Sequence, residues 1–181
     1  AIDSELLEPL AELIGKEGKD CLFELGLQSV HEKSLHLLNR NHSFKDFQDA
    51  VTLLKGYGCF EVGAHLIFGI PGESEEEMLD SVRTVCDMGV DALKLHHLQV
   101  IRGTALEKMY VGEEFAPFDL DSYLQLLLRV VASIPPQVTV HRLWATSHPN
   151  LLVAPRWNVL ANLLSERLRQ MMSEKGVYQG K

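Results

Sequence analysis

The sequence is poor in cysteine and has no closely spaced cysteine pair. Its 181 residues include three cysteines, Cys21, Cys59 and Cys86, which are separated by long gaps. An odd number at this spacing fits neither a disulfide framework nor a CxxC metal knuckle, so each is expected to pack as a small apolar group. We therefore expect no metal site formed by this chain alone.

Long apolar runs and an excess of basic residues are also missing. Uninterrupted apolar runs are only a few residues long, far short of the roughly 20 residues of a membrane span. The N-terminal segment contains acidic residues and no Lys or Arg before Lys16. This does not fit a secretion or import signal, so a cytoplasmic location is expected. The net charge of −8 argues against a general nucleic-acid binder. The segment 142–181 is mildly basic, which leaves nucleic acid weakly supported as a partner, and solvated helix faces are the preferred explanation.

Strand-like and helix-like segments alternate along the chain, which predicts an α/β fold with a parallel sheet. Right-handed crossovers would wind such a sheet into an open doubly wound sheet or part of a (β/α) barrel. The expected helices are 2–14, 43–57, 74–88, 120–132 and about 157–172, and the expected strands are 21–28, 62–70, 90–101 and 138–143. We divide the chain into βα units over residues 1–143 and a helical extension over 144–181.

Each predicted strand has one apolar face and one face with polar or ionisable side chains. Successive strand residues point to opposite faces, which places Glu24, His65, Lys94, His96 and His141 on the polar side. Burying such groups without partners costs about 1–3 kcal/mol each. A ligand cavity lined by this face would provide partners, and so would a hydrated sheet face with local pairs such as Glu24 with Lys94.

The segment Phe68-Gly-Ile-Pro-Gly-Glu-Ser74 joins a predicted strand to a predicted helix. Gly69 and Gly72 allow a tight turn and a close backbone approach, and the first helical turn offers free N–H groups to an anion or a carbonyl-bearing cofactor. The three glutamates Glu75–Glu77 oppose a phosphate there. A simple capped turn, with Ser74 and Glu77 as a capping box, explains the pattern as well.

Several segments together resemble the latter half of the radical S-adenosylmethionine (SAM) superfamily domain, and in particular its YhcC-like subgroup. The matching segments are Glu24–Ser29, Leu38–His42, His65–Ser74, Lys94–Thr104, Pro135-Pro136, His141-Arg142 and Tyr178–Lys181. The resemblance implies the C-terminal part of a partial (β/α) TIM-like barrel. It also implies an enzyme that uses SAM, a 4Fe–4S cluster and a 5′-deoxyadenosyl radical on an unknown substrate.

The resemblance also implies roles for individual residues. Gln28 is similar to a residue that contacts SAM, and Arg40 is similar to the arginine near the SAM carboxylate, which suits a guanidinium fork. His65 stands where related enzymes have an aspartate near the ribose, and a neutral imidazole can also bond a hydroxyl. Gly69-Ile70-Pro71-Gly72 resembles the loop beside the adenine. Glu24, Lys94, His96 and His141 are candidates for the substrate side by strand parity.

The family's CxxxCxxC motif, whose thiolates hold the cluster, does not occur in this sequence. We therefore interpret the chain as a portion of a longer protein. This portion is expected to lack the cluster and to be inactive alone. Its expected partners are the remaining half of the barrel and a second copy, which would pair with an exposed sheet edge.

Two other functions remain open from the sequence. The chain could be a non-catalytic α/β module that binds a ligand or a protein. It could also be an unrelated barrel enzyme that binds a phosphorylated metabolite through Gly69–Ser74. Phosphate binding without any effect of SAM would favour the second of these.

Overall fold

A four-stranded parallel sheet forms the centre of the computed structural model, which describes residues 4–181. The strand order is β1-β2-β3-β5, and a separate two-stranded antiparallel sheet pairs β4 with β6. The strands are β1 (Cys21–Gln28), β2 (Phe60–Phe68), β3 (Ala92–His97), β4 (Val100–Ile101), β5 (Thr139–Arg142) and β6 (Leu152–Ala154). The helices are α1 (Ser4–Glu17), α2 (Glu32–Leu37), α3 (Phe44–Gly56), α4 (Glu75–Asp87), α5 (Ala105–Val111), α6 (Leu120–Ser133) and α7 (Ala161–Lys175).

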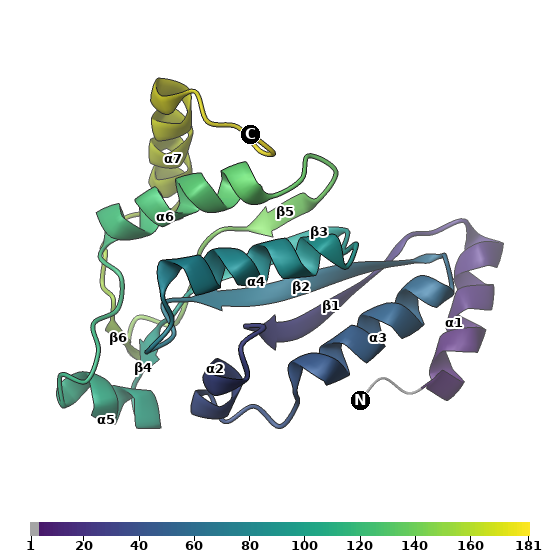
Figure 1. Cartoon of the computed structure of the whole chain (residues 1–181), viewed down its shortest axis with the longest axis horizontal. Coiled ribbons are helices and arrows are strands. Elements are labelled where there is room, and N and C mark those ends of the chain that lie inside the picture. Colours follow the sequence, from purple (N-terminus) through teal and green to yellow (C-terminus); the bar gives the residue numbers. More distant parts are fainter. Residues whose placement is uncertain (1–3) are drawn as a thin grey trace.

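The helices α3, α4 and α6 form one layer against one face of the parallel sheet (Figure 1). The strands point toward the end of the molecule where α2, α5 and the small sheet lie, so the loops that follow the strands gather at that end (Figure 1). In parallel α/β sheets this carboxyl end is where ligand sites form. The predicted α/β class and the parallel sheet are confirmed.

The core lies between the sheet and this helical layer. Six strand side chains that face the helices are no more than 1% exposed, and several helix side chains are equally buried. The strand members are Leu27, Val62, Leu66, Phe68, Leu93 and Leu95, and the helix members include Leu54, Val82, Val85, Leu124 and Leu127. The apolar alternation in the sequence therefore predicts the correct face of β1, β2 and β3.

Side-chain caps fix where the long helices begin. The Ser43 hydroxyl accepts from the Asp46 N–H while the Asp46 carboxylate accepts from the Ser43 N–H, and Ser74 and Glu77 repeat this arrangement before α4. Each box satisfies donors that the first helical turn leaves free. The Asp119 carboxylate accepts from the Ser122 N–H at the start of α6.

The structure differs from the sequence expectation in the third strand. The predicted strand 90–101 is divided, because β3 ends at His97 and the chain then leaves the sheet to form β4. The Leu98 N–H donates to the Phe68 carbonyl at 2.8 Å, which is the last bond before the departure. β4 then pairs with β6, which lies beyond the boundary that the sequence predicts between residues 143 and 144. The small sheet therefore joins the two predicted units, and their division stays a prediction.

The ends of the chain also differ in detail from the expectation. The predicted N-terminal helix starts at Ile2, which lies outside the described residues, and α1 continues to Glu17. The last helix begins at Ala161 rather than near Trp157, because the Trp157 indole N–H donates to the Phe118 carbonyl at 3.0 Å and holds this segment in a loop. No helix in residues 4–181 is long and apolar enough to cross a membrane.

Candidate functional site

The polar face of the sheet places two charged residues from non-adjacent strands together. Lys94 Nζ on β3 lies 2.7 Å from Glu24 Oε2 on β1. The strand between them, β2, has Gly63 opposite Glu24, so no side chain of β2 blocks the approach at that level. The hydrogen bond from Lys94, more than any other contact, lowers the pKa of Glu24. This carboxylate is therefore ionised at neutral pH.

Two histidines form the next pair on the same face. His65 Nε2 on β2 lies 2.9 Å from His96 Nδ1 on β3, and their rings meet edge to face. Burial, followed by nearby positive charge, lowers the pKa of both imidazoles, and that of His96 falls to about 4. Both rings are neutral at pH 7, so one donates and the other accepts. His96 Nε2 is buried and has no partner among the described residues, which leaves it available to a ligand.

His141 and Arg142 lie where β5 joins this face. The register shifts between Leu93 and Lys94, so Lys94 is aligned with Arg142 rather than with His141. His141 Nδ1 still lies 3.8 Å from Glu24 Oε1. The structure thus brings five residues of the predicted set into three contacts: Glu24 contacts Lys94 and His141, and His65 contacts His96. It adds Arg142, which strict alternation from His141 would place on the other face.

A polar corner forms at the carboxyl end of β1. Arg40 Nη2 donates to the Gly26 carbonyl at 3.1 Å. A Cβ on Gly26 would stand 3.1 Å from Gln28 Nε2 and 3.4 Å from Arg40 Nη2, so a side chain there would crowd both groups. Gln28 has a φ of 74° and is 7% exposed, and its Oε1 has no partner among the described residues. The structure therefore places Gln28 and Arg40 around one small residue.

A cavity of about 450 Å³ lies beside this corner. It is lined by Leu25 and Gly26 of β1, Arg40, His42 and one side of α3. His42 Nε2 is buried without a partner in the described chain. The sequence interpretation did not select His42, although the segment Leu38–His42 was part of the family resemblance. The loop after α2 supplies both His42 and Arg40.

The turn from Gly69 to Gly72 is held tightly on two sides. Gly69 has a φ of 88°, and a Cβ there would lie 2.9 Å from Phe118 Cδ2. Lys33 Nζ donates to the Gly72 carbonyl at 3.0 Å and lies 2.5 Å from Glu77 Oε1. Ile70 is 1% exposed, so its side chain packs inside the fold. A cavity of about 180 Å³ follows the turn and includes Gly69–Gly72 and Phe118.

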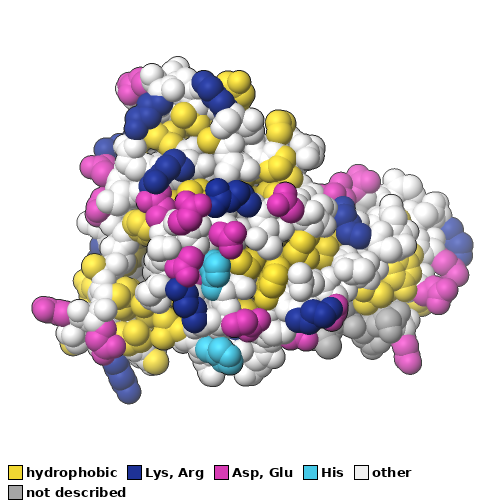
Figure 2. Space-filling model, viewed as in Figure 1, with side chains coloured by type: hydrophobic (Ala, Val, Ile, Leu, Met, Phe, Trp, Pro, Cys, Tyr) yellow, Lys and Arg dark blue, Asp and Glu magenta, His cyan; other side chains and the backbone are white. Residues whose placement is uncertain are grey.

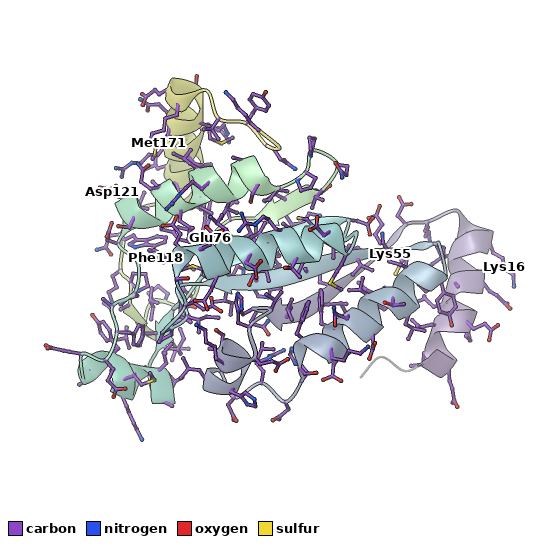
Figure 3. All side chains as sticks on the ribbon, in the orientation of Figure 1. Lys16, Lys55, Glu76, Phe118, Asp121 and Met171 are labelled. Atoms are coloured by element: carbon purple, nitrogen blue, oxygen red, sulfur yellow. The ribbon has the colours of Figure 1, made fainter. Side chains whose placement is uncertain are left out.

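The start of α4 beside this turn is already occupied by acidic side chains. Glu77 accepts from the Ser74 N–H at 2.8 Å, and the hydrogen bond from Lys33, followed by that from Ser74, lowers the pKa of Glu77 to about 2. Glu75 forms an ion pair with Arg129. Glu76 and Phe118 lie at this same end of the helical layer (Figure 3). These carboxylates disfavour the phosphate site considered for Gly69–Ser74.

The three cysteines lie at the opposite end of the strands from Arg40 and Gln28. Cys21 begins β1, Cys59 immediately precedes β2, and Cys86 lies in the last turn of α4. Burial raises the pKa of the Cys86 thiol to about 11, which disfavours the thiolate that metal binding requires. No group of three or more His, Cys, Asp or Glu side chains in residues 4–181 is arranged to hold a metal ion. The residues of this chain do not fit an iron–sulfur cluster.

Comparisons with known proteins match both halves of the chain to one superfamily. Residues 2–85 match the Radical SAM superfamily model, and residues 90–174 match the Radical_SAM C-terminal domain. Uncharacterized protein YtqA of Bacillus subtilis is 32% identical over 180 residues, which is 99% of this chain and 55% of YtqA. Protein YhcC of Escherichia coli is 35% identical over 141 residues, which is 78% of this chain and 45% of YhcC.

A solved structure shows the same arrangement of elements. The archaeal Methanocaldococcus infernus Elp3 with an N-terminal deletion superimposes with a TM-score of 0.77 at 27% identity, over 95% of this chain and 40% of that one. The chain thus spans about half the length of the curated relatives that it matches. Its parallel sheet corresponds to part of a radical SAM domain. The chain belongs to the radical SAM superfamily.

Proposed function

We propose that this chain contributes the Arg40 corner to a SAM-binding site and the polar sheet face to the substrate side of a radical SAM enzyme. The observation that carries the proposal is that the buried Gln28 Oε1 has no partner among the described residues. It lies beside Arg40, and a side chain on Gly26 would crowd both Gln28 and Arg40. A buried amide oxygen without a partner costs about 1–3 kcal/mol, which a donor from a ligand would recover.

Arg40 is suited to a carboxylate. Its bond to the Gly26 carbonyl uses one of five guanidinium N–H groups and fixes the orientation of the side chain. The remaining groups can form a bidentate contact, which is the geometry that distinguishes arginine from lysine. In this proposal Arg40 binds the SAM carboxylate, and Gln28 Oε1 accepts from an N–H donor of the same ligand.

The other residues implied by the resemblance take supporting places in the proposal. The backbone of Gly69-Ile70-Pro71-Gly72 lies beside the adenine, and the neutral His65 ring bonds a ribose hydroxyl. Because His65 is already bonded to His96, a ribose contact would use its other nitrogen. When bound, SAM supplies the 5′-deoxyadenosyl group that this superfamily uses for radical chemistry.

The substrate side is proposed for the pair Glu24–Lys94 and for His96 and His141. The ion pair places one negative and one positive group on the same face, and His96 Nε2 adds an unpartnered position beside them. Such a face suits a substrate with both donors and acceptors. The complete protein would supply the cluster, because the cysteines of this chain do not fit it.

Calorimetric titration of the chain with SAM tests the proposal. Arg40→Ala should weaken binding by about 10- to 100-fold, the range expected for a hydrogen bond to a charged group. Arg83→Ala is the matched control, because Arg83 lies on α4 and pairs with Glu76 away from this corner. Equal SAM affinity in the two variants, or no SAM binding at all, would contradict the proposal and favour a non-catalytic module.

A further inference from the structure

Another cavity, of about 280 Å³, lies on the helix side of the sheet, beyond the end of β3. His97 contributes to its floor and is 4% exposed. Because His97 follows His96 in β3, its side chain points away from the polar face that carries Lys94 and His96. The cavity is therefore separate from both the Arg40 corner and the substrate side.

Hydrogen bonds hold the loop on one side of this cavity. The Ala145 N–H donates to His97 Nδ1 at 3.3 Å, and Gln99 Nε2 lies 3.3 Å from His97 Nε2. The Ser147 hydroxyl donates to Gln99 Oε1. His97 and Gln99 thus fix the loop that carries Trp144, which also lines the cavity.

Aromatic packing holds the other side. The Trp157 ring lies 4.0 Å from the His97 ring, centroid to centroid, and 5.3 Å from the Tyr123 ring. Its indole N–H is fixed on the Phe118 carbonyl. The chain has two tryptophans, and both line this cavity. Rigid indole rings at a cavity wall favour planar ligands, which stack on them.

The charges at the cavity select the sign of the ligand. Its lining contains Arg156 and no Asp or Glu, which disfavours a cation. Arg156 Nη2 donates to the Leu152 carbonyl at 2.7 Å, and no carboxylate in residues 4–181 lies within ion-pair distance of Arg156. The cavity also borders the start of α7 at Ala161, where the preceding Leu160 provides no side-chain cap. The free N–H groups of that turn add to the attraction for an anion.

We propose that this cavity binds a nucleotide unit, with the base against Trp144 and Trp157 and the phosphate at Arg156 and the first turn of α7. The volume is close to the lower end for small-molecule sites, about 300 Å³, which suits one base with its phosphate at the rim. The unit could come from a free mononucleotide or from a single-stranded RNA. The proposal does not rest on SAM binding at the Arg40 corner.

The two indole N–H signals in an NMR spectrum of the intact chain test the proposal directly, because both tryptophans line the cavity. Titration with adenosine and uridine monophosphates should shift both signals saturably. Arg156→Gln should weaken binding of the monophosphates by about tenfold, the effect of losing one charge-assisted contact, and should leave binding of the nucleosides unchanged. Arg169→Gln, on an exposed part of α7 outside the cavity, should change neither.

Three further arms decide between outcomes. A short single-stranded RNA that binds more tightly than the monophosphates would identify RNA as the source, and the reverse would identify the free nucleotide. Trp144→Leu should weaken the binding of all of these ligands, while the remaining indole signal, from Trp157, reports that the chain is folded. Three results would overturn the proposal. The indole signals could stay unshifted at millimolar nucleotide, Arg156→Gln could bind the nucleotides as tightly as the unsubstituted chain does, or benzoate could shift the indole signals as much as the nucleotides do.

Discussion

Lys94 on β3 and Glu24 on β1 are joined across the intervening strand β2, with Nζ and Oε2 2.7 Å apart. The side chains of the pair are only 26% and 42% exposed, so water screens the pair less than it screens a surface salt bridge. The contact ties the edge strand β1 to the inner strand β3. It also fixes the only acid that β1 presents on the polar face.

Glu24→Gln should lower the free energy of unfolding by about 1 kcal/mol, because Lys94 loses its charged partner. Asp49→Asn is the matched control: Asp49 pairs with Lys45 one turn apart on the exposed side of α3, and its loss should cost less than about 0.5 kcal/mol. Urea denaturation of both variants measures the difference. Equal effects would show that the cross-strand pair adds no stability.

His96→Gln and His97→Gln should each reduce the acid sensitivity of the fold. Burial is the main cause that lowers the pKa of each histidine in the folded chain to about 4, against 6.5 for the unperturbed group. The unfolded chain therefore binds more protons between these values, and stability is full above pH 6.5 and falls as the pH approaches 4. The slope is up to about 1.4 kcal/mol per pH unit for each histidine. Denaturation curves across this range should be flatter in each variant, and unchanged slopes would contradict burial as the cause.

Gly69→Ala should destabilise the chain by about 2–3 kcal/mol, because a Cβ at a φ of 88° would press against the Phe118 ring at 2.9 Å. Gly72 provides the control within the same turn. Its φ of 82° is similar, but no atom lies within 4 Å of its Cβ position, so Gly72→Ala should cost only about 1 kcal/mol. Thermal unfolding compares the two, and similar losses would mean that strain alone, and not the contact with Phe118, restricts this turn.

The chain should self-associate through the open edge of β1 when it is prepared alone. In the described sheet β1 pairs only with β2, and unpaired strand edges form intermolecular contacts. Light scattering should show a mass that rises with concentration, and Leu25→Lys, at the cavity beside this edge, should reduce the association. A mass that stays that of one chain at every concentration would contradict this prediction.

Local rules in the sequence were sufficient for much of the fold and for part of the site. The capping box at Ser74 and the apolar alternation of β1 and β3 depend on residues a few positions apart, so they located α4 and placed Glu24 and Lys94 on one face. The contact between Glu24 and Lys94 was anticipated as one alternative for this face.

Other features depend on long-range packing and had no local signal. The register shift beside Lys94, which aligns it with Arg142, arises from the pairing of β3 with β5. The six-residue helix α2 is too short for a helical pattern to be recognised. His42 and the Trp144–Trp157 cavity involve loops whose positions follow from tertiary contacts.

Figure 2 shows basic and acidic side chains interleaved over the helical side, as expected from solvated helix faces.

The most direct test of the central claim is an NMR titration of the chain with SAM that follows the side-chain signals of Arg40 and Gln28, with the guanidinium signal of Arg83 on α4 as the internal reference. Binding at the Arg40 corner predicts saturable shifts of the Arg40 guanidinium and Gln28 amide signals and an unchanged Arg83 signal. Unchanged Arg40 and Gln28 signals at millimolar SAM, or shifts confined to Trp144 and Trp157, would contradict the assignment of this corner to SAM.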